Sequence, residues 1–214
     1  MSIQVAWSQI LGLAPKALPA YQQAFAYAQA ALDRHGISAN ALRVAHFMAQ
    51  VLHESSALTL QSENLNYSAA RLVAVWPSRF KPIGALDPAQ YAKNPQALAN
   101  QVYGGRMGNN MPGDGYKFRG RGLLQLTGKN NYVEATNNVR KFNPACPDFA
   151  NEPDQLMDAL WCVEVAAAKW DVNACNPLAD QDNIQAVTLK INGGTIGLSD
   201  RSLWLARCKT VWHQ

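Results

Sequence analysis

A glycine-rich stretch near the middle of the chain limits the fold more than any other feature. The segment GNNMPGDGYKFRGRG, residues 108–122, holds five glycines and one proline. Both residue types disfavour the interior of a helix, so this segment must be an irregular loop. The apolar run LLQLT that follows, residues 123–127, predicts a short strand. We therefore expect a small β-element near residues 115–126.

The rest of the chain shows the apolar spacing of helices. We expect helices over residues 5–35, 41–57, 128–139, 153–170, 180–191 and 199–211. Residues 59–75 are expected to form a loop and a short helix, and residues 86–106 two short helices. Because no internal repeat or linker interrupts this pattern, we predict one mainly α domain over residues 1–214. Residues 1–36 would form an N-terminal helical segment packed on it.

Composition indicates a globular protein with a basic surface. The 214 residues are 48% hydrophobic and 16% charged, with a net charge of +4. This excess favours an anionic partner, although an ordinary basic soluble protein is the alternative. The charges form no run of five or six of one sign, so we expect no nucleic-acid partner.

The chain also lacks the signals of membrane insertion or export. No apolar stretch reaches the roughly 18 residues of a membrane span. The N-terminus has no positively charged region of the kind that begins a signal peptide. We therefore expect synthesis in the cytoplasm, no stable membrane insertion, and a separate route to any other destination.

Metal and redox motifs are incomplete. HESSA, residues 53–57, opens like the zinc-protease motif H-E-x-x-H but ends in Ala57. His46 and His53 would lie about 10.5 Å apart along a helix, too far to share a metal. The cysteines Cys146, Cys162, Cys175 and Cys208 form no C-x-x-C pair. We expect no metal or cofactor, and buried thiols, with one disulfide left open.

Two glutamates carry the strongest suggestion of catalysis. On a helix over residues 41–57, Glu54 shares a face with Phe47 and Val51 and lies near the C-terminal end. Burial and the negative helix end would both raise the pKa of its carboxyl group, as a general acid requires. The alternative is a structural salt bridge with a buried arginine.

Glu63 lies nine residues further on, among polar residues of a loop. One protonated and one ionised carboxyl group across a groove are the components of glycoside hydrolysis. A loop position allows a separation of roughly 6.5–9.5 Å, which leaves room for water and predicts inversion of the anomeric centre. A solvated loop glutamate with no catalytic role is the alternative.

Four segments together resemble glycoside hydrolase family 19. They are FMAQVLHESSAL, SENLNYSAARL, RMGNNMPGDGYKFRGRGLLQLTGKNNY and INGGTIGLSDR, in family order from about residue 44 to residue 201. That family contains plant and bacterial chitinases and phage lysins that cut peptidoglycan. The residues of these segments are most similar to those of phage or prophage endolysins. The resemblance implies a mainly α, lysozyme-like, two-lobed fold with a cleft between the lobes.

The resemblance also implies residue roles. Glu54 matches the general acid, Glu63 the general base, and Thr127 a hydroxyl that helps Glu63 hold the attacking water. Further cleft positions are Gln125, Asn131, Asn192, Arg201, Tyr67, Tyr116 and His53, with Arg201 tuning the acid's environment. Gln125 and Asn131 could instead tie loops together, and Tyr67 could belong to the core. Arg119 and Arg121 could pin the glycine-rich loop or contact ligand.

Bacterial peptidoglycan is the expected substrate. Plant chitinases tend to carry an acidic residue just after INGG, where this chain has Thr195 and Ile196. Anionic peptide stems also suit the net positive charge. A chitinase and a non-catalytic wall-binding module remain alternatives, and the sequence does not decide which glycosidic linkage is cut. We expect a monomer that, by analogy with lysins, reaches the wall through a holin-type pore.

Overall fold

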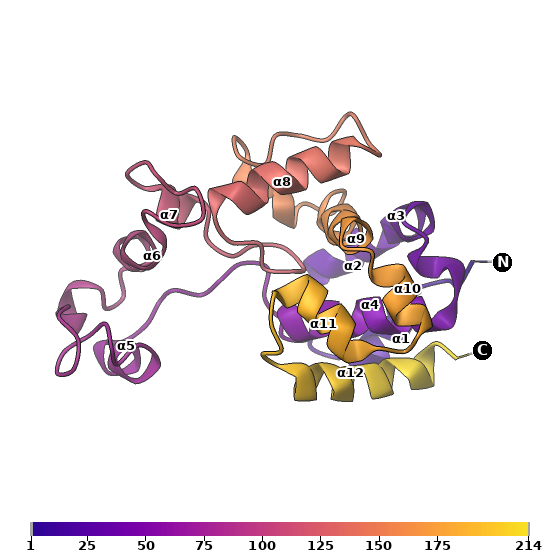
Figure 1. The fold of residues 1–214 in the computed structure, drawn as a ribbon, viewed down its shortest axis with the longest axis horizontal. Helices are drawn as coiled ribbons and strands as arrows, with labels where there is room; N and C mark the ends of the chain where they lie inside the picture. The colour runs from indigo at the N-terminus through magenta and orange to yellow at the C-terminus, as the bar shows by residue number, and fades with distance from the viewer. Residues whose placement is uncertain (1, 214) are drawn as a thin grey trace.

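The computed structural model describes residues 2–213, which form a helical molecule (Figure 1). The α-helices are α1 (Trp7–Leu13), α2 (Pro19–Ala26), α3 (Ala28–Arg34), α4 (Ala41–Glu54), α5 (Ala69–Val75), α6 (Pro95–Tyr103), α7 (Asp114–Lys117), α8 (Lys129–Arg140), α9 (Cys162–Val172), α10 (Cys175–Asp180), α11 (Ile184–Asn192) and α12 (Leu198–Val211). Short 3₁₀ helices cover Ile37–Ala39, Pro88–Gln90 and Pro153–Met157. None of these described helices is long and apolar enough to cross a membrane.

The molecule has two lobes. In the small lobe, residues 65–116, buried side chains of α5, α6 and their connections form a separate apolar cluster that includes Leu72 and Leu98. The large lobe contains the main core, built from α1–α4 and α9–α12. Figure 1 shows α5, α6 and α7 on one side, away from α4, α11 and α12. The mainly α, two-lobed fold expected from the sequence is confirmed.

Helix α4 runs through the large lobe and ends at Glu54. Its N-cap is Asn40, whose side chain accepts a hydrogen bond from the backbone N–H of Arg43. Every residue from Val44 to Leu52 is buried, so the main core fixes the helix on all sides. Ser56, Ala57 and Leu58 have φ of 49°, 57° and 60°, which is incompatible with a continuing helix. The helix expected to reach residue 57 therefore ends three residues earlier.

The expected helix over residues 5–35 is three helices. Pro15 lies in the break between α1 and α2, and Pro19 is the first residue of α2, where its missing N–H costs nothing. Likewise, the helix expected over residues 153–170 begins as a 3₁₀ turn, and only α9 is a true α-helix. In the first case Pro15 stands in the break between α1 and α2. In the second the backbone becomes extended at Asp158, with a ψ of 143°, and the helix starts again at Cys162.

The expectation of a strand at LLQLT, residues 123–127, is wrong. Among residues 2–213 there are only isolated β-bridges, and two of them pair Arg121 with Leu126 and with Ser62. The backbone turns back between Arg121 and Leu126, with Gln125 at a φ of 46°. Leu123 and Leu124 are apolar because they enter the main core. The glycine-rich loop before this turn also contains the short helix α7, which we did not expect.

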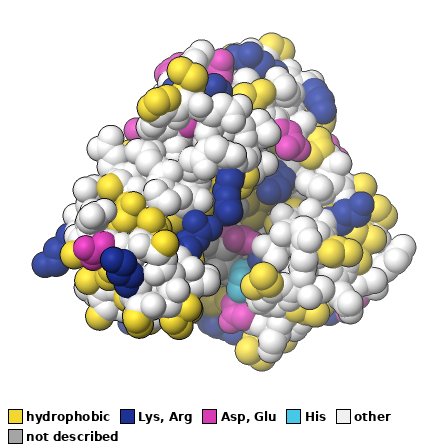
Figure 2. Space-filling model, turned by 60° about the vertical axis from the view of Figure 1, so that its left-hand side comes forward, with side chains coloured by type: hydrophobic (Ala, Val, Ile, Leu, Met, Phe, Trp, Pro, Cys, Tyr) yellow, Lys and Arg dark blue, Asp and Glu magenta, His cyan; other side chains and the backbone are white. Residues whose placement is uncertain are grey.

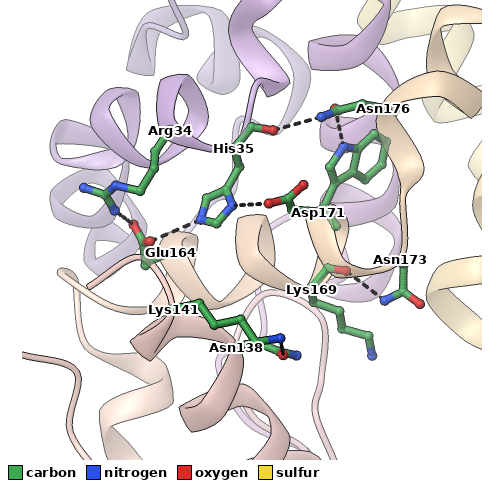
Figure 3. Close-up of polar contacts among 10 residues, drawn as sticks. Arg34, His35, Asn138, Lys141, Glu164, Lys169, Asp171, Asn173 and Asn176 are labelled. Atoms are coloured by element: carbon green, nitrogen blue, oxygen red, sulfur yellow. Dashed lines mark hydrogen bonds and ion pairs between the residues drawn. The ribbon is translucent and has the colours of Figure 1, made fainter. Parts of the chain in front are cut away.

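Polar contacts around the buried His35 join α3 to α9. His35 lies between the carboxylates of Glu164 and Asp171, each 3.2 Å from a ring nitrogen, and Arg34 also pairs with Glu164 (Figure 3). The backbone carbonyl of His35 accepts a hydrogen bond from Asn176. These contacts fix α9, whose other side faces α8 and the glycine-rich loop.

The four cysteines are free and buried, as expected. Burial raises the pKa of the Cys146 thiol to about 11 and those of Cys162, Cys175 and Cys208 to about 12. They are therefore protonated near neutral pH and serve as small apolar side chains of the core.

Candidate active site

The candidate site lies where α4 ends and the chain crosses towards the small lobe. Figure 2 shows a hollow on this face of the molecule, in which acidic, basic and histidine side chains meet. Glu54 is the last residue of α4, and Glu63 follows in the irregular segment before α5. Part of the glycine-rich loop and the start of α8 complete the site.

Glu54 is held by an arginine. Its carboxylate accepts a hydrogen bond from Arg201 of α12, and its side chain is 19% exposed while that of Arg201 is 1% exposed. Arg201 also donates to Gln50, one turn earlier on α4. The expectation of an apolar pocket around Glu54 is therefore wrong. The alternative, a salt bridge with a buried arginine, describes its surroundings. The reason is that α12 packs along α4, which places a guanidinium at the end of the apolar stripe.

Glu63 is held by the backbone and by a tyrosine. Its N–H donates to the carbonyl of Gly120 at 2.8 Å, which anchors the segment to the glycine-rich loop. Its Oε1 atom accepts a hydrogen bond from the Tyr103 hydroxyl at 2.6 Å. The side chain is half-buried, so the alternative of a freely solvated loop residue is wrong. Sequence reasoning missed Tyr103, because the contact depends on how α6 packs beside Glu63 and no motif marks it.

Three residues assigned from the resemblance meet around Gly120. A Cβ atom at this glycine would lie 3.3 Å from Glu63 Cβ, 3.3 Å from Thr127 Oγ1 and 3.1 Å from Gln125 Oε1. The Thr127 hydroxyl itself donates to the carbonyl of Gln125 at 3.2 Å. A side chain here would crowd all three residues and push them apart by a few tenths of an ångström.

Gln125 and Asn131 also tie loops together. Gln125 donates its amide N–H to the carbonyl of Gly122 at 3.0 Å, and Asn131 donates to the carbonyl of Thr127 at 2.7 Å. Asn131 in addition lines a small cavity with Lys169 of α9 and Glu134 of α8. This loop-tying contact is the alternative that the sequence left open, and it fixes the Thr127 backbone.

Lys169 is a second residue that the sequence analysis missed. Burial lowers its pKa, and the negative charges of Glu54 and Glu134 act in the opposite direction. Figure 3 shows its side chain extending away from His35 on the other side of α9. Lys169 therefore lines the cavity beside Asn131 and also feels the charge of Glu54.

The segment INGGTIGLSDR borders the end of α4. The His53 ring packs against Gly197, where a Cβ atom would lie only 2.5 Å from the ring, and His53 Nδ1 is 2.6 Å from Asp200. Asn192 is exposed at the end of α11, with its amide 3.5 Å from the Gly194 carbonyl. The structure thus brings His53 and Arg201 to Glu54, and leaves Asn192 at the surface of this segment.

The two tyrosines assigned to the cleft lie on the small-lobe core. Tyr67 packs edge-on against Trp76, with ring centroids 5.3 Å apart, and is half-buried. Tyr116 stacks against the guanidinium of Arg119 at 4.3 Å. Neither makes a hydrogen bond through its side chain to Glu54 or Glu63 within the described residues.

Arg121 pins the glycine-rich loop. It is 3% exposed and donates to the carbonyl of Lys117 at 2.7 Å and to the hydroxyl of Tyr132 at 2.9 Å. It also pairs with Asp154 at 2.8 Å. This buried set of contacts agrees with the structural alternative for Arg121 rather than with a ligand contact.

The arrangement provides two carboxylates on separate elements, each held by a different hydrogen-bond donor. A hydroxyl lies beside one of them and a guanidinium beside the other. In residues 2–213, no group of three or more His, Cys, Asp or Glu side chains is placed to hold a metal ion. The groups present can donate and accept protons, which is what acid–base hydrolysis of a glycosidic bond requires.

Known proteins share both the sequence and the fold. No family model matches the sequence. A glycosyl hydrolase family 19 domain-containing protein of Haemophilus influenzae is 36% identical over 165 residues, which cover 76% of each chain. A bacterial family 19 chitinase has a TM-score of 0.65 at 19% identity, over 98% of this chain and 95% of that one. Chitinase C of Streptomyces griseus has a TM-score of 0.62 at 17% identity, over 98% and 76%. This chain belongs to glycosyl hydrolase family 19.

Proposed function

We propose that this family 19 hydrolase cleaves the β-1,4 glycosidic bonds of bacterial peptidoglycan by a single displacement with inversion. The observation that carries the proposal is the meeting of Glu63 and Thr127 around Gly120, with Glu54 and its arginine at the end of α4. Two carboxylates on different elements can act from opposite faces of a sugar ring.

Each residue has a distinct part in the proposed reaction. Glu63 accepts a proton from the attacking water. The Thr127 hydroxyl helps to hold this water, because a hydroxyl can donate one hydrogen bond and accept others. Glu54 protonates the leaving oxygen, and Arg201 then balances the negative charge that Glu54 has gained. No step calls for a metal or cofactor.

Charge supports peptidoglycan over chitin. The chain has a net charge of +4, and basic side chains gather around the hollow in Figure 2. A basic site attracts the anionic peptide stems of the wall polymer more strongly than neutral chitin. Chitin is the second candidate, because the solved structures that share the fold are chitinases. We also propose that the protein acts as a monomer on the wall, after release through a partner pore.

Product analysis tests both the substrate and the stereochemistry. Purified peptidoglycan and chitin oligomers are each incubated with the wild type and with Glu63→Gln. Fresh products are examined by NMR for the anomer that forms first. The proposal expects α-anomeric products from peptidoglycan with the wild type, and a rate at least 100-fold lower with Glu63→Gln. Turnover of chitin alone, or β-anomeric first products, would overturn it.

A further inference from the structure

The carboxylate of Glu63 has a half-buried partner that the proposed mechanism does not use. The hydroxyl of Tyr103, at the end of α6, lies 2.6 Å from Glu63 Oε1. We infer that Tyr103 is a positioning residue for the general base: it binds one carboxylate oxygen and leaves the other, Oε2, for the attacking water. This inference rests on the proposed function, because it deepens the role given there to Glu63.

The direction of this hydrogen bond follows from the environment of the phenol. Burial raises the pKa of Tyr103 well above its ordinary value, and the hydrogen bond to Glu63 raises it further. The phenol therefore keeps its proton at any working pH, and it can only donate to an ionised carboxylate. The positive charge of Arg79 acts in the opposite direction, with a smaller effect.

The second oxygen of Glu63 is left with a weak partner. Oε2 lies 3.5 Å from the backbone nitrogen of Gly120, a long distance for a hydrogen bond. The Thr127 hydroxyl lies beside the same glycine, 3.3 Å from the position of a Cβ atom there. A strong donor on Oε1 and a weak one on Oε2 make Oε2 the more available base, on the side where Thr127 could hold water.

Tyr103 and Thr127 are also held relative to each other. The carbonyl of Tyr103 accepts a hydrogen bond from the Asn109 side chain at 3.0 Å, and the same side chain accepts one from the Lys129 N–H at 2.9 Å. Asn109 is 1% exposed, so water does not compete for these contacts. The end of α6 is thereby fastened to the start of α8, two residues after Thr127. The phenol and the hydroxyl thus reach Glu63 from a shared support.

A purely structural role for Tyr103 makes a different prediction from a positioning role. A structural contact would change stability and leave the ionisation of the base unaltered. Loss of a donor to an ionised carboxylate instead raises the pKa of that carboxyl group, because the charged form loses a stabilising hydrogen bond. The acidic limb of the pH–rate profile would then move to higher pH.

The test compares Tyr103→Phe with the wild type on whichever of peptidoglycan or chitin oligomers the wild type cleaves. We expect kcat to fall about tenfold, KM to stay within about twofold, and the acidic limb of kcat/KM to move to higher pH. The matched control is Tyr91→Phe, which removes a small-lobe hydroxyl whose one hydrogen bond within residues 2–213 is to Gln101, at 3.4 Å. The control should match the wild type in all three quantities. An unmoved acidic limb in Tyr103→Phe would overturn the inference.

A second measurement separates this inference from the proposed function. The Glu63 carboxyl carbon is titrated by NMR in free protein, in the wild type and in Tyr103→Phe, without substrate. A higher titration midpoint in the variant supports the inference, and equal midpoints overturn it, whatever the enzyme cleaves. Failure to cleave peptidoglycan would refute the proposed function alone. If Tyr103→Phe does not fold, 3-fluorotyrosine can replace Tyr103 instead. Its phenol is a stronger hydrogen-bond donor, so the titration midpoint of Glu63 should fall. An unchanged midpoint would overturn the inference.

Discussion

Arg201 of α12 forms an ion pair with Glu54 at the end of α4, although 147 residues separate the two in the sequence. The arginine is almost fully buried, and its Nε atom has no hydrogen-bond partner within residues 2–213. Its two terminal nitrogens are taken up by Glu54 and Gln50. The pair therefore serves both the fold and the candidate site, since it fixes α12 on α4 and holds the carboxylate that we propose as the general acid.

Removing this arginine should cost stability. Arg201→Met would leave the Glu54 carboxylate without its counter-charge and Gln50 without its donor. Because Glu54 is 19% exposed and water can reach it, we expect the free energy of unfolding to fall by about 2–3 kcal/mol, at the low end for a buried ion pair. Urea denaturation near neutral pH measures this. The exposed Arg106→Met is the control and should change the value by less than about 0.5 kcal/mol. Equal values for the two variants would contradict the prediction.

Adding one methyl group at Gly120 should reduce activity more than stability. In Gly120→Ala the new Cβ atom meets Glu63, Thr127 and Gln125 at 3.1–3.3 Å, so these side chains must move apart by a few tenths of an ångström. We expect kcat to fall about tenfold, since such displacements matter to a base that must contact water. The control is Gly12→Ala in α1, where nothing lies within 4 Å, and kcat should not change. Thermal unfolding confirms that both variants fold.

The hydroxyl of Thr127 should contribute more to the catalytic rate than its methyl group does. Thr127→Ser keeps the hydroxyl and should retain most of the rate, whereas Thr127→Val keeps the shape and removes both donor and acceptor. We expect Val to lower kcat by about 10- to 100-fold, with little change in the free energy of unfolding because the residue is only half-buried. Initial rates on the same substrate measure this. Equal rates for the two variants would show that the hydroxyl takes no part.

The helical core could be predicted from sequence because its signal is local. Helix α4 has apolar residues on every face from Val44 to Leu52 and a capping asparagine at residue 40, and both features are visible in one sequence. The prediction of a strand was wrong because an apolar run can form either a strand or a turn whose side chains enter the core. Leu123 and Leu124 enter the core from a turn, and neighbouring residues do not distinguish that from a strand.

The candidate site was likewise predicted only where the signal is local. Glu54 could be found from its helical position, but its partner Arg201 comes from a helix far along the chain, so the residues around Glu54 suggested an apolar pocket. Glu63 looked solvated because its neighbours in sequence are polar. Its actual surroundings are Tyr103 and Gly120, which come from other segments. Contacts between segments far apart in the sequence depend on packing, and the residues next to Glu54 and Glu63 in the sequence do not reveal them.

The last prediction concerns His46 and the dependence of stability on pH. His46 lies on α4, is fully buried, and has one ring nitrogen 2.8 Å from Asp182 and the other without a partner within residues 2–213. Burial lowers its pKa; Asp182 opposes this, and the positive charge of Lys209 adds to it. The unfolded chain therefore takes up a proton at a higher pH than the folded protein does. The contribution of His46 to stability is complete above about pH 6.5 and is lost as the pH falls from there through the lower, folded-state pKa.

A comparison with His46→Gln isolates this effect from other groups that titrate. We expect the variant to be less stable than the wild type at about pH 7.5, because it loses packing and the contact with Asp182. The difference in the free energy of unfolding should shrink as the pH is lowered to about 5.5, by at most about 1.4 kcal/mol per pH unit for one proton. Urea denaturation at several pH values measures both proteins. A difference that stays constant would mean that Asp182 balances the cost of burial, and one that grows at low pH that Asp182 outweighs it; either would contradict the prediction.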